Sequence, residues 1–239
     1  MRAPIAALAL AVALLGASVA PAARGPRAID QVWTRPDFAR LGVRGIAMLP
    51  PTTFDHNLEA EKVVQTEWGR LFAGTGYRWV SATTTRDQLR AMGGDSLLRA
   101  INLAVQEGGR IDSLMAPALC ARFRTGALLT VRADQWGQVA IAPEQSGKPT
   151  TTIQMQAALV DSTGRLLWRI SGSEFAEGVY VEPIEGVTQA SGSAVTRSTG
   201  LHGSTAAGAP PAYVDVVDRL LARWVKLFPA RSAAADSAK

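Results

Sequence analysis

Hydrophobic and polar positions recur along the chain with two different periods. Before residue 126, most apolar residues recur every three or four positions, which is typical of helices that bury one face. After residue 126 they recur at every second position, which is typical of strands with one buried face. The change of period predicts a mainly helical first half followed by an antiparallel sheet.

The first half is predicted to open with a β-α-β unit. An apolar run at 43–49 ends at a Pro-Pro pair and reads as a strand. Asp55 or Asn57 can cap a helix that runs to about Ala73, and residues 77–81 form a second strand. The apolar stripe of this helix consists of Ala60, Val64, Trp68 and Leu71.

A block of three short helices is predicted next, over about 85–123. Thr85, Asp95 and Asp112 are the expected caps, and Gly-Gly pairs separate the helices. Three or four strands then form an antiparallel meander with one solvated face. A last helix starts after Pro210-Pro211, with its apolar stripe at Val214, Val217, Leu221, Trp224 and Phe228. This order predicts an α/β fold: a mixed sheet in two or three layers.

The ends of the chain and one long loop stand apart from this domain. A positive residue, an apolar run and small residues at 1–22 are typical of a cleaved secretory signal peptide, so we expect a periplasmic or secreted protein. We predict a lead-in segment at 23–42, with Trp33 and Phe38 tucked against the domain. The other predicted parts are a single domain at 43–228, a flexible Gly/Ser/Thr-rich loop at 183–210 and a disordered tail at 229–239.

Composition excludes several classes of protein. With 47% hydrophobic and 19% charged residues, the chain is too apolar for a disordered protein. One cysteine cannot form an internal disulfide, and two histidines with one cysteine are too few for a zinc site of four such ligands. The net charge of +5 comes from scattered residues rather than a basic run, so no nucleic-acid partner is expected. We expect no metal and no cofactor.

Three stretches of the sequence carry a resemblance to a known superfamily. They are the strand 45–50 with the Gly74-Thr75-Gly76-Tyr77 entry to the next strand, the strand entry at 125–129, and the hairpin 159–168 with its Asp-x-x-Gly turn. In these stretches the chain resembles the superfamily of the curli secretion-channel lipoprotein, the penicillin-binding-protein activators and the N-terminal domain of the Tol–Pal translocation protein.

The resemblance covers about 43–228 and implies an α/β fold and a role in the cell envelope. Two features depart from the family pattern. No cysteine lies near the predicted cleavage site, so we expect no lipid anchor. The segment 183–210 is too polar for a membrane-crossing hairpin, which argues against a channel.

Two sets of candidate site residues follow from local composition. Trp136 and Asp134 lie near a predicted strand end, and His202 lies in the long loop, so all three are candidates for binding a partner protein. Asp55, His56 and Glu59 follow the first strand and could act as an acid/base cluster. The same three residues also fit an ordinary solvated helix N-terminus, where acids are favoured.

Our function hypothesis is a non-enzymatic, exported envelope protein that acts by protein–protein contacts in assembly or maintenance of the periplasm or outer membrane. No motif of a nucleophilic elbow, a phosphate-binding loop or a zinc protease occurs in the sequence. The alternative is a periplasmic ligand-binding or hydrolytic enzyme that uses the acids near His56. The sequence does not specify the partner or the oligomeric state.

Overall fold

The computed structural model describes residues 30–142, 145–182 and 208–231. The predicted signal peptide, most of the 183–210 loop and His202 lie outside these ranges. No helix in the described ranges combines the length and the apolar character that crossing a membrane requires.

Seven strands form one mixed sheet, in agreement with the predicted α/β class. The spatial order is β1-β7-β6-β5-β2-β4, and β3 pairs with the far part of β5. The short β2 pairs in parallel with both β4 and β5, whereas β5, β6, β7 and β1 form antiparallel pairs in that order. The strands are β1 (Gln31–Thr34), β2 (Gly45–Met48), β3 (Thr52–Thr53), β4 (Arg78–Val80), β5 (Ala127–Val139), β6 (Thr150–Asp161) and β7 (Leu166–Glu177).

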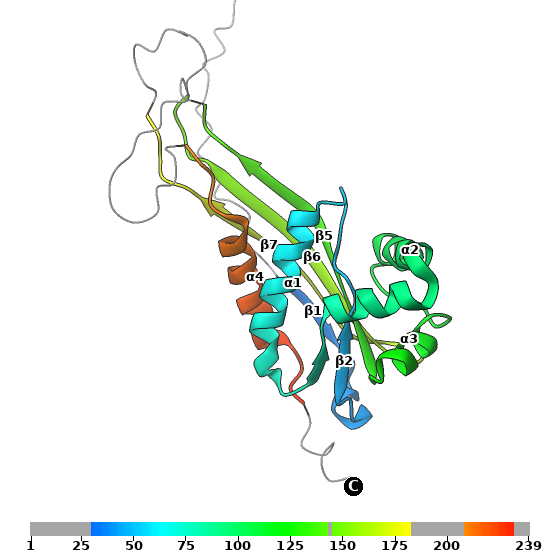
Figure 1. Cartoon of the computed structure of the whole chain (residues 1–239). Coiled ribbons are helices and arrows are strands. Elements are labelled where there is room, and N and C mark those ends of the chain that lie inside the picture. The colour runs from blue at the N-terminus through cyan, green and yellow to red at the C-terminus, as the bar shows by residue number, and fades with distance from the viewer. Residues whose placement is uncertain (1–29, 143–144, 183–207, 232–239) are drawn as a thin grey trace, which may run out of the picture.

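Helices cover both faces of this sheet and make three layers at one end. Figure 1 shows α1 and α4 side by side across the long strands, with α2 and α3 apart from them. Strands β5 and β6 continue past the helices, so the far part of the molecule has fewer layers. The helices are α1 (Leu58–Phe72), α2 (Ala82–Gly108), α3 (Ala116–Phe123) and α4 (Tyr213–Leu227), with 3-10 turns at Phe38–Leu41 and Ala73–Thr75.

The main core lies between the sheet and the pair α1 and α4. Trp68 of α1, Trp168 of β7 and Trp224 of α4 are among its largest fully buried side chains. The predicted stripe of α4 is nearly right, but Val214 is 42% exposed and Val216 and Leu220 are buried instead. Because four buried positions, 216, 217, 220 and 221, recur at helical spacing, α4 is held mainly by its apolar face.

The second face of the sheet is not solvated throughout, contrary to our prediction. Over β5 it carries α2 and α3, which bury Leu128 and Val160 in a smaller core. Thr130 is buried there and donates a hydrogen bond to the carbonyl oxygen of Gly109 at 2.9 Å. Arg132 donates to the carbonyl oxygen of Gln106. These polar side chains therefore pair with carbonyls at the end of α2 instead of with water.

The start of α2 also differs from the prediction. Ser81, not Thr85, is the N-cap, and its hydroxyl accepts from the Thr84 amide. Thr85 is fully buried and donates to the Met48 carbonyl at 2.6 Å. The break at Gly93 and Gly94 is present, but as a kink that joins the two predicted helices in one run. The Thr85 side chain thus links α2 to β2 by a hydrogen bond.

The segment 23–42 contains a strand where we predicted only a lead-in. β1 pairs with β7, and all four of its residues are exposed. Phe38 is buried as expected, whereas Trp33 is 46% exposed. Just before β1, the Asp30 carboxylate accepts hydrogen bonds from Arg223 and from the Trp224 indole. The N-terminal strand is therefore anchored to the last helix.

Candidate functional site

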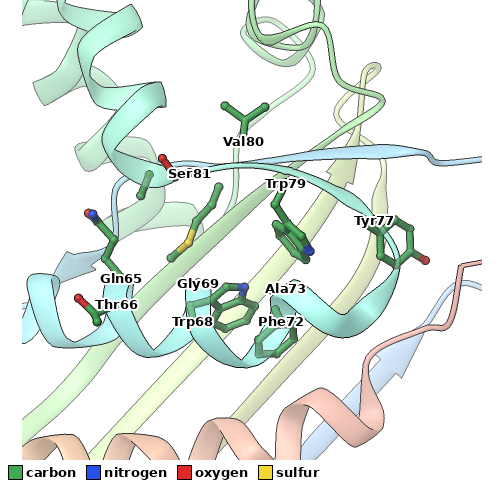
Figure 2. Close-up of a pocket in the computed structure, with 12 residues that line it drawn as sticks. Gln65, Thr66, Trp68, Gly69, Phe72, Ala73, Tyr77, Trp79, Val80 and Ser81 are labelled. Carbon is green, nitrogen blue, oxygen red and sulfur yellow. The ribbon is translucent and has the colours of Figure 1, made fainter.

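A groove of about 500 Å³ lies between α1 and the edge strand β4. Ligand-binding pockets usually measure roughly 300–1,000 Å³, so the groove is large enough for a ligand or for a short stretch of a partner chain. Figure 2 shows the groove from the side, with α1 below and β4 above. Its lining residues are Met48, Gln65, Thr66, Trp68, Gly69, Phe72, Ala73, Tyr77, Trp79, Val80, Ser81 and Ala82. We call this the aromatic groove.

Four aromatic side chains form its walls. Trp68 and Phe72 come from one face of α1 and stack with ring centroids 4.0 Å apart. Trp79 of β4 meets Phe72 edge to face at 6.2 Å, and Tyr77 meets Trp79 in the same way at 6.4 Å. Phe228, which follows α4, closes the cluster by contacting Phe72, Tyr77 and Trp79. The walls are therefore held in place by mutual ring contacts.

The polar atoms of these rings are not all paired. The Trp79 indole donates to the Thr75 hydroxyl at 3.1 Å, and the Tyr77 hydroxyl donates to the Pro229 carbonyl at 3.0 Å. Trp68 is 1% exposed, and within the described ranges its indole N–H has no hydrogen-bond partner. A buried donor without an acceptor is costly, so Trp68 holds an unused capacity to bind an acceptor.

The groove is electrically neutral. None of its lining residues, all of them described, is an Asp, Glu, His, Lys or Arg. Burial raises the pKa of Tyr77 to about 12, an effect that nearby Arg231 opposes. Tyr77 therefore stays uncharged at physiological pH. Such a surface can bind by apolar contact and hydrogen bonding, without ion pairing.

The residues of the predicted acid/base cluster lie elsewhere: Asp55 and His56 on the turn between β3 and α1, and Glu59 in the first turn of α1. Asp55, His56 and Glu59 are all exposed, and His56 has a left-handed backbone. The Asp55 carboxylate accepts a hydrogen bond from the Asn57 amide at 3.3 Å. Asn57, one of the two predicted caps, accepts from the Ala60 amide and begins α1.

Glu61, a further acid close to His56 in the sequence, lies in the first turn of α1 and is half-buried. Its pKa is raised by burial, while Arg86 and His56 lower it and Asp55 raises it through charge. Within the described ranges, no group of three His, Cys, Asp or Glu side chains is arranged to hold a metal ion. The turn therefore combines a capping motif with a partly buried carboxylate.

Trp136 is buried, contrary to the prediction that it forms an exposed partner surface. It is 7% exposed and stacks on Tyr213 of α4 with ring centroids 4.4 Å apart. A register shift in β5 between Ala133 and Gln135 directs Trp136 to the helix-covered face. Asp134 is half-buried and accepts from Arg132 at 2.5 Å and from Gln156 at 3.0 Å. Trp136 therefore offers no exposed surface to a partner, and Asp134 already accepts two hydrogen bonds within the molecule.

The aromatic groove was not predicted, although the places of two of its residues were. The sequence pattern puts Trp68 in the core and Trp79 in a strand, and both predictions are confirmed. The groove depends on the packing of α1 beside β4, so local periodicity does not reveal it. The only sequence signal is the density of aromatic residues, since Trp68, Phe72, Tyr77 and Trp79 fall within twelve positions.

Comparison with known proteins gives no family, but it gives partial structural likenesses, among them the following three. No family model and no curated protein matches the chain. The structure of lipoprotein GNA1162 from Neisseria meningitidis is 20% identical and matches 56% of this chain and 83% of its own, with a TM-score of 0.40. The PelC dodecamer from Paraburkholderia phytofirmans is 12% identical over 64% and 82%, with a TM-score of 0.37.

The third likeness is to the hypothetical protein CT253 from Chlamydia trachomatis. It is 11% identical and matches 56% of this chain and 73% of its own, with a TM-score of 0.33. None of the three bears the name of a family in the superfamily that the sequence resembles, so that resemblance stays a prediction.

Proposed function

We propose that this chain is an exported cell-envelope protein that acts by binding a partner protein in its aromatic groove, and that it catalyses no reaction. The signal-peptide pattern at 1–22 supports export. The groove replaces Trp136 and Asp134 as the contact surface, because both of those side chains are engaged inside the molecule. The envelope role in assembly or maintenance follows the sequence resemblance.

One observation carries the proposal: a groove with four aromatic walls and no charged lining residue. Tryptophan and tyrosine are enriched where a few residues supply most of the binding free energy of a protein interface. Such rings combine a large apolar area with few rotatable bonds, so little conformational entropy is lost on binding. The groove also borders β4, which is an edge strand of the sheet.

Hydrolysis at the Asp55 turn is the alternative that we do not favour. Asp55, His56 and Glu59 are exposed, and a catalytic acid or base usually lies in a cleft that alters its protonation and excludes water. The groove has room for a ligand, but its lining contains no nucleophile with a neighbouring base.

Site-specific photo-crosslinking in cells tests the proposal. A benzophenone side chain placed at Thr66, an exposed residue of the groove lining, is expected to form one defined adduct with an envelope protein. The same group at Arg122, exposed on α3 over the other face of the sheet, is the control and should not form that adduct. Filling the groove with Gly69→Leu should abolish the Thr66 adduct. Equal adducts at both positions, or none at Thr66, would contradict the proposal.

A further inference from the structure

We propose that the aromatic groove binds an extended, proline-containing segment of the partner, with a backbone carbonyl of that segment accepting a hydrogen bond from the Trp68 indole. This inference rests on the proposed function and adds the chemical class of the ligand. It follows from three properties of the groove: an unused donor, aromatic walls and the absence of charge.

The unpaired Trp68 N–H favours a ligand that carries a hydrogen-bond acceptor. The Trp68 N–H is the one polar ring atom of the lining that has no partner among the described residues, since Trp79 and Tyr77 use theirs internally. The Trp136 N–H is also unpaired within the described ranges, but Trp136 does not line the groove. A proline-rich segment offers carbonyl acceptors, and its proline nitrogens bring no N–H that would need an acceptor in return.

The aromatic side chains of the groove favour a rigid, apolar ligand. Segments in the polyproline II conformation dock into grooves lined with aromatic side chains, because their pyrrolidine rings fit between aromatic faces. Such a segment is already extended before binding, so it loses less conformational entropy than a flexible chain. The half-buried Trp79 supplies the accessible face, and Trp68 and Phe72, each 1% exposed, lie behind it.

The shape of the groove leaves room along α1. Gly69 and Ala73 lie four residues apart and therefore share one side of the helix. Figure 2 shows both on the side that faces β4. A Cβ atom built on Gly69 would meet nothing within 4 Å. These small residues make a floor on which a segment can lie across the rings.

Other ligand classes fit these properties less well. A saccharide needs acceptors and donors for many hydroxyl groups, whereas Gln65 already donates to Thr83 and Ser81 already caps α2. An acyl chain would leave the buried Trp68 N–H without an acceptor. A charged segment would find no counter-ion in the described lining.

Binding is expected to move one ring. The Trp68 nitrogen is shielded from water, and Figure 2 shows Trp79 between it and β4. A carbonyl can reach the buried nitrogen only if a neighbouring side chain moves, and the half-buried Trp79 ring is the one that we expect to turn. The indole fluorescence of the protein should therefore change when the groove is occupied.

Titration of the purified protein with a blocked decaproline peptide tests the inference, with a blocked Gly-Ser repeat of the same length as the control peptide. We expect saturable binding of the proline peptide, seen in tryptophan fluorescence and in the indole N–H signal of Trp68 by NMR. Trp68→Phe keeps an aromatic ring but removes the donor, and should weaken binding about tenfold. Gly69→Leu should weaken it more, whereas Gly108→Leu should bind normally, since a Cβ at Gly108 also meets open space but lies outside the groove.

Three results would overturn the inference: no proline-peptide binding, equal binding by Gly69→Leu, or equal binding of the Gly-Ser peptide. A wild-type affinity in Trp68→Phe would overturn the carbonyl contact. If the proline peptide fails while the Thr66 crosslink forms and Gly69→Leu abolishes it, the proposed function stands and the ligand class is wrong. If both fail, the groove is not the contact surface.

Discussion

Asp30 shows how one buried carboxylate can hold a strand in place. Its side chain is 9% exposed and accepts from Arg223 at 2.9 Å and from the Trp224 indole at 3.0 Å. A Cβ atom on Gly172 would clash with the nearer Asp30 carboxylate oxygen, so only glycine leaves room for the carboxylate. We conclude that Gly172 is there to admit Asp30.

Asp30→Ala is expected to lower the free energy of unfolding by about 2 kcal/mol, because it leaves the Trp224 N–H and part of Arg223 without an acceptor. Gly172→Ala should act in the same direction by displacing the carboxylate. Urea denaturation measures both. The control is Asp37→Ala, which removes a surface ion pair with Arg35 and should cause no measurable change. Similar stability of all three variants would rule out the anchoring role of Asp30.

Tyr77 gives the folded protein a dependence on alkaline pH. Its pKa is about 12 when folded and 10.0 ordinarily, chiefly because of burial. The unfolded chain therefore loses this proton first, and stability falls as pH rises from about 10 to about 12. The expected loss due to Tyr77 is about 1.3 kcal/mol between about pH 9 and about pH 11.

The pH dependence of urea denaturation measures this effect. Over the same alkaline range, Tyr77→Phe should lose stability less steeply than the wild type, whatever its stability at neutral pH. Tyr180→Phe, which changes an exposed tyrosine, should keep the wild-type slope. Part of the slope remains in Tyr77→Phe, because burial also raises the pKa of Cys120 to about 11. Identical slopes in the wild type and Tyr77→Phe would show that Tyr77 does not titrate in this way.

Among the elements, α2 depends on its kink. Gly94 has φ of 63° and ψ of −160°, a conformation that only glycine adopts without strain. The kink lets Leu89 before it and Ile101 after it both reach the smaller core. A straight helix through these residues would carry one of them away from the sheet.

Gly94→Ala is therefore expected to destabilise the protein by about 1–2 kcal/mol through backbone strain. Gly74→Ala is the matched control, since Gly74 has neither a left-handed backbone nor a neighbour within 4 Å of an added Cβ. Thermal unfolding compares the two, and Gly74→Ala should melt at or slightly above the wild-type temperature. Equal melting temperatures would mean that α2 can be straight at no cost.

The elements whose apolar residues recur at a regular spacing were predictable from the sequence. The elements that depend on partners far along the chain were not. The stripe of α1 reflects one buried face, and so does the alternation at the far ends of β5 and β6, whereas both faces of β5 are buried over 127–131. The sequence of β1 has no alternation of apolar and polar residues, because all its residues are exposed. Its pairing with β7 is what makes it a strand. Thr130 looked solvated because its acceptor, the Gly109 carbonyl, belongs to another part of the chain.

The candidate site could not be predicted for the same reason. Trp136 lies in a polar stretch, and its burial requires both the register shift in β5 and Tyr213, which lies far along the chain in α4. The aromatic groove requires Trp68 and Trp79 to face each other across the gap between α1 and β4. The aromatic residues are visible in the sequence, whereas the space between them is a property of the packing.

For the molecule as a whole, the two function hypotheses predict opposite effects of two variants. Because the groove is the proposed contact surface, Gly69→Leu should fail to restore the function of a strain lacking the gene. An Asp55→Ala/His56→Ala double variant should restore it fully, because both side chains are exposed and outside the groove. Complementation of an envelope-stress or growth phenotype measures both. Restoration by the first variant and failure of the second would favour the enzyme.

The anchoring of β1 also affects the order in which the chain can fold. Asp30 binds Arg223, which lies 193 residues further along, and β1 pairs with β7 near the end of the sheet-forming sequence. Such distant contacts form slowly, because a long loop must close first. The N-terminal strand therefore has no strand partner until β7 has been made, and Asp30 has no ion-pair partner until α4 has been made. A newly made chain stays incomplete at its leading end until both β7 and α4 have been made.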